Sequence, residues 1–145
     1  MLMLPRLIAS LTPIFFAGCV SIVDESTSPT HSYLLGDAFL IHPAILCIEP
    51  EGALRSPPNS LKGDYGQEPC PKSELLASFS AGHPIEIAAI MKVNVPGPKP
   101  VSRWLLTGQI DGLAFYYYYG HGPYKGDSPS NPQELVWSKS RLTCS

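Results

Sequence analysis

The dipeptide Asp111-Gly112 lies between two runs of residues that favour strands, 102–110 and 113–119. Aspartate and glycine both tolerate the positive backbone φ angles that a two-residue turn between antiparallel strands requires. The flanking runs are rich in aliphatic and aromatic side chains, which suit a pleated, half-buried surface. The pattern therefore predicts a β-hairpin over 102–119, around which the rest of the chain has to pack.

A second strand signal precedes the hairpin. After a turn at 81–84, apolar residues alternate, and one strand face is expected to carry Ile85, Ile87, Ala89, Met91 and Val93, the other Glu86, Ala88, Ile90 and Lys92. Sixteen prolines and twelve glycines argue against long helices. We expect an all-β domain of about seven short strands. It would form a small antiparallel β-barrel, SH3-like in its order of turn, strand, loop and hairpin, or a compact sandwich.

Residues 1–18 are expected to be a lipoprotein signal peptide outside the fold. The apolar run at 7–16 is too short to cross a membrane as a helix. The following Phe16-Ala17-Gly18-Cys19 resembles a bacterial lipobox, in which the cysteine is lipidated and becomes the new N-terminus. Phe16 departs from the usual aliphatic residue, and the alternative is an ordinary signal peptide. Both alternatives predict export.

Lipidation of Cys19 has consequences for location. In bacterial lipoproteins an aspartate after the cysteine commonly retains the protein at the inner membrane. Here Val20 follows, so we expect anchoring to the periplasmic face of the outer membrane, through the lipid alone. Residues 19–32, rich in serine and threonine, are expected to be the lipidated cysteine and a flexible tether. Residues 33–145 then form a single β domain.

Three cysteines remain for an oxidising compartment: Cys47, Cys70 and Cys144. We favour a disulfide between Cys47, in an apolar strand, and Cys70, in a long polar loop over 51–73 that needs anchoring. Pairing of Cys70 with Cys144 is the alternative. The spacing of cysteines and histidines is not of zinc type, so no metal site is expected.

Four consecutive tyrosines follow the hairpin turn, and a strand must divide them between two faces. Tyr117 and Tyr119 share a face with Leu113 and Phe115 and are expected in the core. The other face would lie outside or under a covering loop. We expect Tyr116, Tyr118, His121 and Tyr124 to form a partner-binding surface, since tyrosine is enriched at interfaces. The alternative is that aromatic residues simply suit strands.

Several function classes are disfavoured. The sequence contains no nucleophile, dinucleotide, phosphate-loop or metalloprotease motif and no paired carboxylates, so we expect no enzyme, no catalytic residue and no cofactor. The formal charge is −2, becoming −3 once Arg6 leaves with the leader. The absence of a basic run argues against nucleic acid as a partner. A small binding protein is the simplest expectation.

The segments AILCIEP (44–50), GQEPCPKSELLASFSAGHPIEI (66–87) and RWLLTGQIDG (103–112), together with the lipobox, resemble the lipoprotein immunity proteins of type VI secretion toxins. The resemblance covers residues 44–112. It implies a protein partner, the cognate toxin, of the phospholipase type that attacks membranes from the periplasm. The immunity protein would bind that toxin, occlude its active site and perform no chemistry itself. From the residues of this sequence, we expect the contacts to come from Tyr116, Tyr118, His121, Tyr124 and the 51–73 loop.

Two other functions stay open. The first is an SH3-like envelope module that binds peptidoglycan or an envelope assembly partner. The second is an inhibitor of external hydrolases such as lysozyme, which would favour a more acidic surface than a charge near −3 supplies.

Overall fold

The computed structural model describes residues 19–49, 57–64, 70 and 74–140, and within these it is all-β. One short 3-10 turn, η2 (Ser32–Leu34), interrupts the strands. The described residues contain nine strands rather than the expected seven: β1 (Ser21–Asp24), β2 (Gly36–Leu40), β3 (Ala44–Ile48), β4 (Asn59–Gly63), β5 (Glu74–Phe79), β6 (Pro84–Val95), β7 (Val101–Ile110), β8 (Leu113–Gly122) and β9 (Trp137–Ser138). The all-β class is confirmed.

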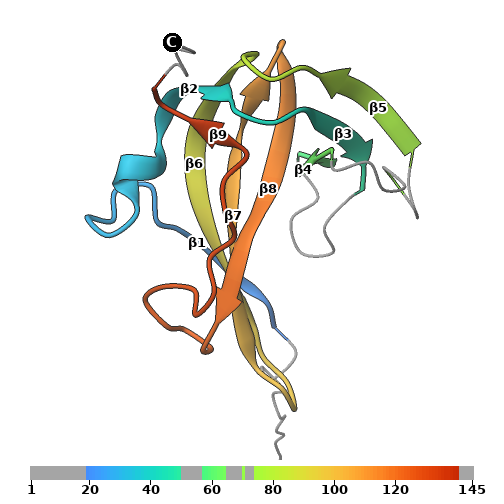
Figure 1. Cartoon of the computed structure of the whole chain (residues 1–145). Coiled ribbons are helices and arrows are strands. Elements are labelled where there is room, and N and C mark those ends of the chain that lie inside the picture. Colours follow the sequence, from blue (N-terminus) through green and yellow to red (C-terminus); the bar gives the residue numbers. More distant parts are fainter. Residues whose placement is uncertain (1–18, 50–56, 65–69, 71–73, 141–145) are drawn as a thin grey trace, which may run out of the picture.

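The strands form one sheet that curls into a half-barrel (Figure 1). Their order is β5-β3-β4-β8-β7-β6-β2-β9, and β1 pairs with the half of β6 that β2 leaves free. The long strands β6, β7 and β8 form its centre. All pairs are antiparallel except β4 with β8, which meet in parallel at one position, Ser60 opposite Tyr116. That single parallel contact joins the β3–β4–β5 arm to the rest of the sheet.

The predicted hairpin is confirmed as β7 and β8. Asp111 and Gly112 connect the strands with φ angles of 52° and 76°, which are the positive values that the turn requires. Ile110 and Leu113 face each other directly on either side of this turn. His83 Nε2 lies 2.7 Å from Asp111 Oδ1, so the same turn is tied to the turn that begins β6.

The main core lies inside the curl of the sheet. It draws on strands from both ends of the sheet and on the segment that leads to β9. Its members include Leu40, Leu46, Leu61, Ile87, Ile90, Trp104, Leu106, Phe115, Val136 and Trp137. A smaller cluster of Val93, Leu105 and Tyr116 lies on the opposite face of β6–β8. The central strands therefore bury side chains on both faces.

The alternation expected along β6 is correct at Ile85 and Ile87 and wrong beyond them. The pairing of β6 with β7 shifts between Ile87 and Ala89, so one extra residue sits in β6. A bulge of this kind turns the following side chains to the opposite face. Ile90 consequently joins the main core, and Val93 joins the smaller cluster.

This bulge requires a glycine on the neighbouring strand. A Cβ atom added at Gly108 would lie 1.9 Å from the backbone carbonyl oxygen of Glu86. The oxygen is part of the backbone and cannot rotate away, so any side chain at position 108 would displace one of the two strands. The extra residue in β6 and the absence of a side chain at position 108 thus depend on each other.

Most of the predicted tether packs on the domain, and the expectation of a flexible segment is wrong for residues 21–32. Ser21–Asp24 forms β1, which pairs with β6 in the register Ser21 opposite Asn94. Glu25 forms an ion pair with Lys92 at 2.9 Å, and the ring of His31 is buried, only 3% exposed. The sequence lacks an apolar period here because β1 adds to a sheet edge through its backbone, while its own residues stay exposed.

The long loop expected at 51–73 contains a strand. Residues Asn59–Gly63 form β4 between β3 and β8, while 50–56, 65–69 and 71–73 lie outside the described residues. The favoured disulfide between Cys47 and Cys70 is confirmed. Cys144, its alternative partner, falls outside the described part of the chain. In the residues described, no helix has the length and apolar character to span a membrane.

Candidate partner-binding site

The tyrosines of β8 divide between two faces as expected. Tyr117 and Tyr119 join the main core, only 4% and 8% exposed. The Tyr117 hydroxyl donates a hydrogen bond of 2.8 Å to the Glu134 carbonyl oxygen, and its ring meets Trp137 edge-to-face. Burial, together with the phenol of Tyr33, raises the pKa of Tyr119 to about 12. The ring of Tyr117 therefore helps to hold the segment that leads to β9 against the sheet.

Tyr116 was expected on the partner-binding surface, and that expectation is wrong. Its side chain is 4% exposed and packs with Val93 and Leu105. Its hydroxyl donates a hydrogen bond to the carbonyl oxygen of Glu49, just beyond β3. The ring is buried where β4 meets β8, and no local pattern in the sequence indicates that pairing. Tyr116 is a core residue that connects the β3–β4–β5 arm to the central strands.

Tyr118 and His121 do lie together. The Tyr118 hydroxyl and His121 Nδ1 are hydrogen-bonded at 2.7 Å. Residues three apart in a regular strand point to opposite faces, but the pairing of β7 with β8 shifts between Trp104 and Leu105. The extra residue in β8 brings His121 onto the face of Tyr118. His121 is exposed and Tyr118 half-buried, so the pair offers an accessible aromatic and imidazole surface.

Tyr124 belongs to a different place in the structure. It lies in the turn after β8, half-buried, and the Lys125 ammonium lies 5.3 Å from the centre of its ring. The Lys125 backbone N–H donates to the Ser102 hydroxyl, which fixes this turn on β7. The four residues expected to form one surface are thus a buried Tyr116, a half-buried Tyr118 paired with an exposed His121, and a separate Tyr124.

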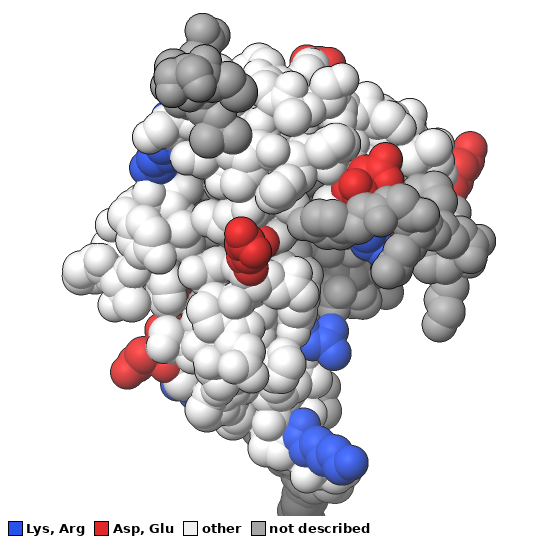
Figure 2. All heavy atoms as spheres, in the orientation of Figure 1, with Lys and Arg blue, Asp and Glu red and all other residues white. Residues whose placement is uncertain are grey.

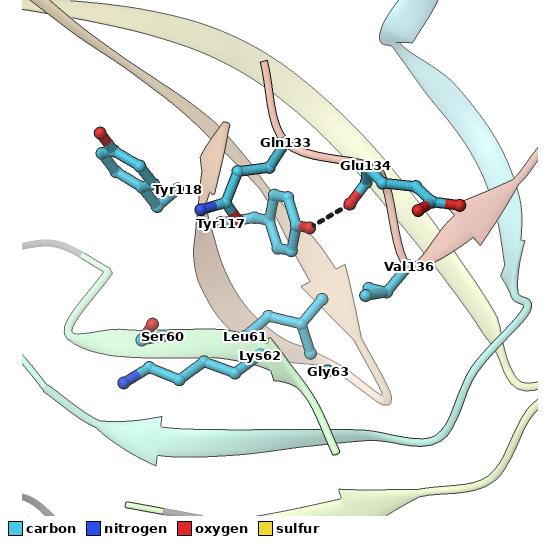
Figure 3. Close-up of a pocket in the computed structure, with 9 residues that line it drawn as sticks. All are labelled: Ser60, Leu61, Lys62, Gly63, Tyr117, Tyr118, Gln133, Glu134 and Val136. Carbon is cyan, nitrogen blue, oxygen red and sulfur yellow. Dashed lines mark hydrogen bonds between the residues drawn. The ribbon is translucent and has the colours of Figure 1, made fainter. Parts of the chain in front are cut away.

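A pocket opens where β4 and β8 separate (Figure 3). The two strands are paired only at Ser60 and Tyr116, and beyond that point they diverge. The volume of about 480 Å³ is in the range that takes a small ligand or a few side chains. Its lining comes from three segments: Ser60, Leu61, Lys62 and Gly63 of β4; Tyr117 and Tyr118 of β8; and Gln133, Glu134 and Val136.

The third wall of the pocket is held by backbone hydrogen bonds. Ser130 N–H donates to the His121 carbonyl oxygen at 2.9 Å, and Gln133 N–H donates to the Tyr119 carbonyl oxygen at 2.7 Å. Gly120 makes this contact possible, because a Cβ there would lie 3.0 Å from Pro129. The segment 130–136 therefore follows the edge of β8 closely and gives the pocket a fixed wall.

The opposite wall presents its backbone to the pocket. Asp64 N–H donates to the Pro43 carbonyl oxygen, and Glu49 N–H donates to the Pro58 carbonyl oxygen. These bonds show which residues of β4 bond to β3: the backbone N–H and C=O groups of the even-numbered residues point toward β3. Peptide groups alternate along a strand, so those of Leu61 and Gly63 point away from β3. The Leu61 N–H serves the pairing of β4 with β8, and Gly63 lies beyond that pairing, beside the pocket. The site combines apolar surface with directed polar groups.

The charges around the pocket are few. Lys62 is paired with Glu49, its ammonium 2.5 Å from the carboxylate. In Figure 3 the carboxylate of Glu134 points away from Tyr117 and Tyr118. The face of the molecule seen in Figure 2 is mostly uncharged, with one acidic group near its middle. Such a face suits recognition through packing and hydrogen bonds more than through net charge.

The sequence does not predict this pocket, because the polar residues and prolines around β4 indicate a loop. Leu61 was the available signal, being an apolar residue alone in a polar stretch, and it is 1% exposed. Among the residues described, no group of three or more His, Cys, Asp and Glu side chains is placed to hold a metal ion.

Comparison with known proteins gives no relative. No protein-family model matches the chain, and no curated protein and no solved structure is significantly similar to it. The inference of function therefore depends on the residues and the geometry of this chain.

Proposed function

We propose that this protein is an outer-membrane lipoprotein, anchored through Cys19 on the periplasmic face, that binds and neutralises a secreted toxin. The observation that carries the proposal is the pocket between β4 and β8, beside the hydrogen-bonded pair of Tyr118 and His121. We infer no chemistry for the protein itself. Its task is to bind a protein partner and cover that partner's active site.

The pocket suits a protein partner for three reasons. Its walls are strands and a hydrogen-bonded segment, so binding orders little of the protein and loses little conformational entropy. Tyr118 and His121 provide aromatic surface at its edge, and anchors of this type dominate binding energy in interfaces. The backbone of β4 supplies directed hydrogen-bonding groups. Together these features favour insertion of a projecting side chain or loop of the partner.

The class of toxin comes from the resemblance to immunity proteins of type VI secretion. The stretch that carries it, residues 44–112, runs from β3 through β7 and includes the β4 wall of the pocket and the Cys47–Cys70 disulfide. We infer a toxin of the phospholipase type, which would act on the same membrane to which this lipoprotein is anchored. Inhibition by a membrane-anchored binder places the inhibitor where the enzyme works.

A rescue experiment tests the proposal. The product of each neighbouring gene is directed to the periplasm of a susceptible host, with and without this lipoprotein. We expect one neighbour to kill the host alone and to be neutralised by co-expression. Absence of toxicity from every neighbour, or toxicity that the lipoprotein does not relieve, would contradict the proposal.

One observation favours a second function, an SH3-like envelope module that binds peptidoglycan. The lining of the pocket includes the half-buried ring of Tyr118 together with the side chains of Gln133 and Ser60, and an aromatic face with polar neighbours suits a sugar. The strong curl of the sheet agrees with a barrel-like module. Sedimentation with purified peptidoglycan separates the two functions, since an immunity protein is expected to stay in the supernatant.

A further inference from the structure

The N-terminal segment that would carry the lipid is fixed to one end of the molecule. β1 runs antiparallel to β6, and its first residue, Ser21, lies opposite Asn94, near the turn between β6 and β7 (Figure 1). Cys19 is two residues before Ser21, and two residues of extended chain span about 7 Å at most. A lipid on Cys19 would therefore hold this end of the domain close to the bilayer, with no long tether between them.

Buried polar contacts make the attachment rigid. The Asn94 amide donates to the Ser21 hydroxyl at 3.1 Å, and the Ser102 hydroxyl donates to the Asn94 side-chain oxygen. Asn94 and Ser102 are 3% and 0% exposed. The Ile90 N–H also donates to the Ser26 hydroxyl at 3.0 Å. The first residues of β1 are thus joined to both strands of the long β6–β7 hairpin.

The same end carries the surface features that a membrane interface requires. Val20, Ile22 and Val23 are 44%, 40% and 41% exposed, which is high for aliphatic side chains. The adjoining turn at 96–100 contains three prolines and the exposed Lys99. Figure 2 places basic groups toward this lower end of the face that it draws. Apolar side chains and a cation beside an acyl anchor match the interface of a bilayer with anionic headgroups.

We propose that β1 and the β6–β7 turn rest directly on the bilayer, with Val20, Ile22 and Val23 in the interface and Lys99 against lipid phosphate. This inference rests on the proposed lipidation of Cys19, and it replaces a free tether with a fixed orientation. Tyr117, in the pocket, pairs with Leu106, which is five residues above Val101 at the base of the turn. At the rise of a β-strand, the pocket is held about 17 Å above that turn. A toxin working at the membrane surface would meet it there.

Fluorescence quenching by brominated lipids tests the orientation. The lipidated full-length protein is placed in vesicles of phosphatidylethanolamine and phosphatidylglycerol, with a tryptophan reporter at the turn (Pro98→Trp) or at the opposite end of β6 (Ser80→Trp). Both positions are exposed, and the native Trp104 and Trp137 are 0% and 4% exposed and common to both variants. We expect several-fold stronger quenching at position 98 than at position 80. A flexible Gly/Ser insert after Val20 should remove the difference.

The outcomes separate this inference from the function on which it rests. Mass spectrometry of the same sample reports acylation of Cys19. Acylated, vesicle-bound protein with equal or no quenching at the two positions overturns the fixed orientation and leaves the anchor intact. Protein that is not acylated at Cys19 overturns both the anchor and the orientation. Replacing phosphatidylglycerol with phosphatidylcholine should weaken the quenching at position 98, and an unchanged signal would remove the role of Lys99.

Discussion

Tyr116 and Tyr118 are two residues apart on the same face of β8, yet replacing Tyr116 by alanine should destabilise the domain far more than replacing Tyr118. Tyr116 is 4% exposed, packs with Val93 and Leu105, and bonds to the Glu49 carbonyl oxygen. Truncating a buried aromatic ring to alanine costs about 4 kcal/mol, from lost transfer energy and the cavity left behind. In a domain of this size each kcal/mol lowers Tm by about 4 °C, so Tyr116→Ala should lower it by about 15 °C.

Two companion variants divide this effect. Tyr116→Phe keeps the ring and removes the hydrogen bond to Glu49, which should cost about 1 kcal/mol. Tyr118→Ala removes a half-buried ring at the edge of the smaller cluster and should also cost about 1 kcal/mol. The three are compared by thermal unfolding followed by circular dichroism, with urea unfolding to obtain free energies. A Tm for Tyr116→Ala within a few degrees of the wild type would refute the assignment of Tyr116 to the core.

Three further predictions concern the fold. Gly108→Ala should lower the free energy of unfolding, measured in urea, by about 3 kcal/mol, because a backbone oxygen lies 1.9 Å from the new Cβ. Gly112→Ala, where the Cβ has open space and the only cost is a positive φ, should lower it by about 1 kcal/mol. Equal losses for the two variants would contradict this. The raised pKa keeps Tyr119 neutral in the folded state at a pH where the same tyrosine is ionised in the unfolded state, so the free energy of unfolding should fall from pH 10 to 12. Tyr119→Phe should reduce that fall in unfolding curves measured at alkaline pH. The same fall in the variant and the wild type would contradict this prediction. Replacing Cys47 and Cys70 together with serine should cost about 3 kcal/mol through lost loop closure, and unfolding of the wild type under reducing conditions should match it.

Local signals in the sequence predicted the parts of the fold that depend on neighbouring residues. Asp111-Gly112 specified the hairpin because positive φ angles at a two-residue turn are a local requirement. The placement of Tyr117 and Tyr119 on one face of β8 and Tyr116 on the other followed from the alternation of side chains along a strand, which is also local. The position of Cys47 in an apolar strand and of Cys70 in a polar loop that needs anchoring favoured their disulfide, which is confirmed. Each of these inferences needed no knowledge of which distant segments pair.

The parts of the fold and of the site that the sequence did not predict depend on pairing between segments far apart in the sequence. β4 joins β8 in parallel across more than fifty residues of sequence, and this contact both buries Tyr116 and creates the pocket. β1 adds to β6 through backbone bonds that leave no apolar pattern in its sequence. Bulges insert single residues into β6 and β8, and each exchanges the two faces beyond it, which moved Ile90 into the core and brought His121 beside Tyr118. No periodicity in a single sequence indicates where such a residue falls.

The central claim is that the pocket beside Tyr118 neutralises a toxin, and the rescue assay with two matched variants tests it most directly. Tyr118→Ala removes the anchor at the pocket, and Tyr33→Ala removes a tyrosine that is 62% exposed and does not line it. Loss of an interface anchor typically costs at least 2 kcal/mol of binding, so Tyr118→Ala should need more than about tenfold higher expression to protect the host. Tyr33→Ala should protect like the wild type. Equal protection by both variants would contradict the account.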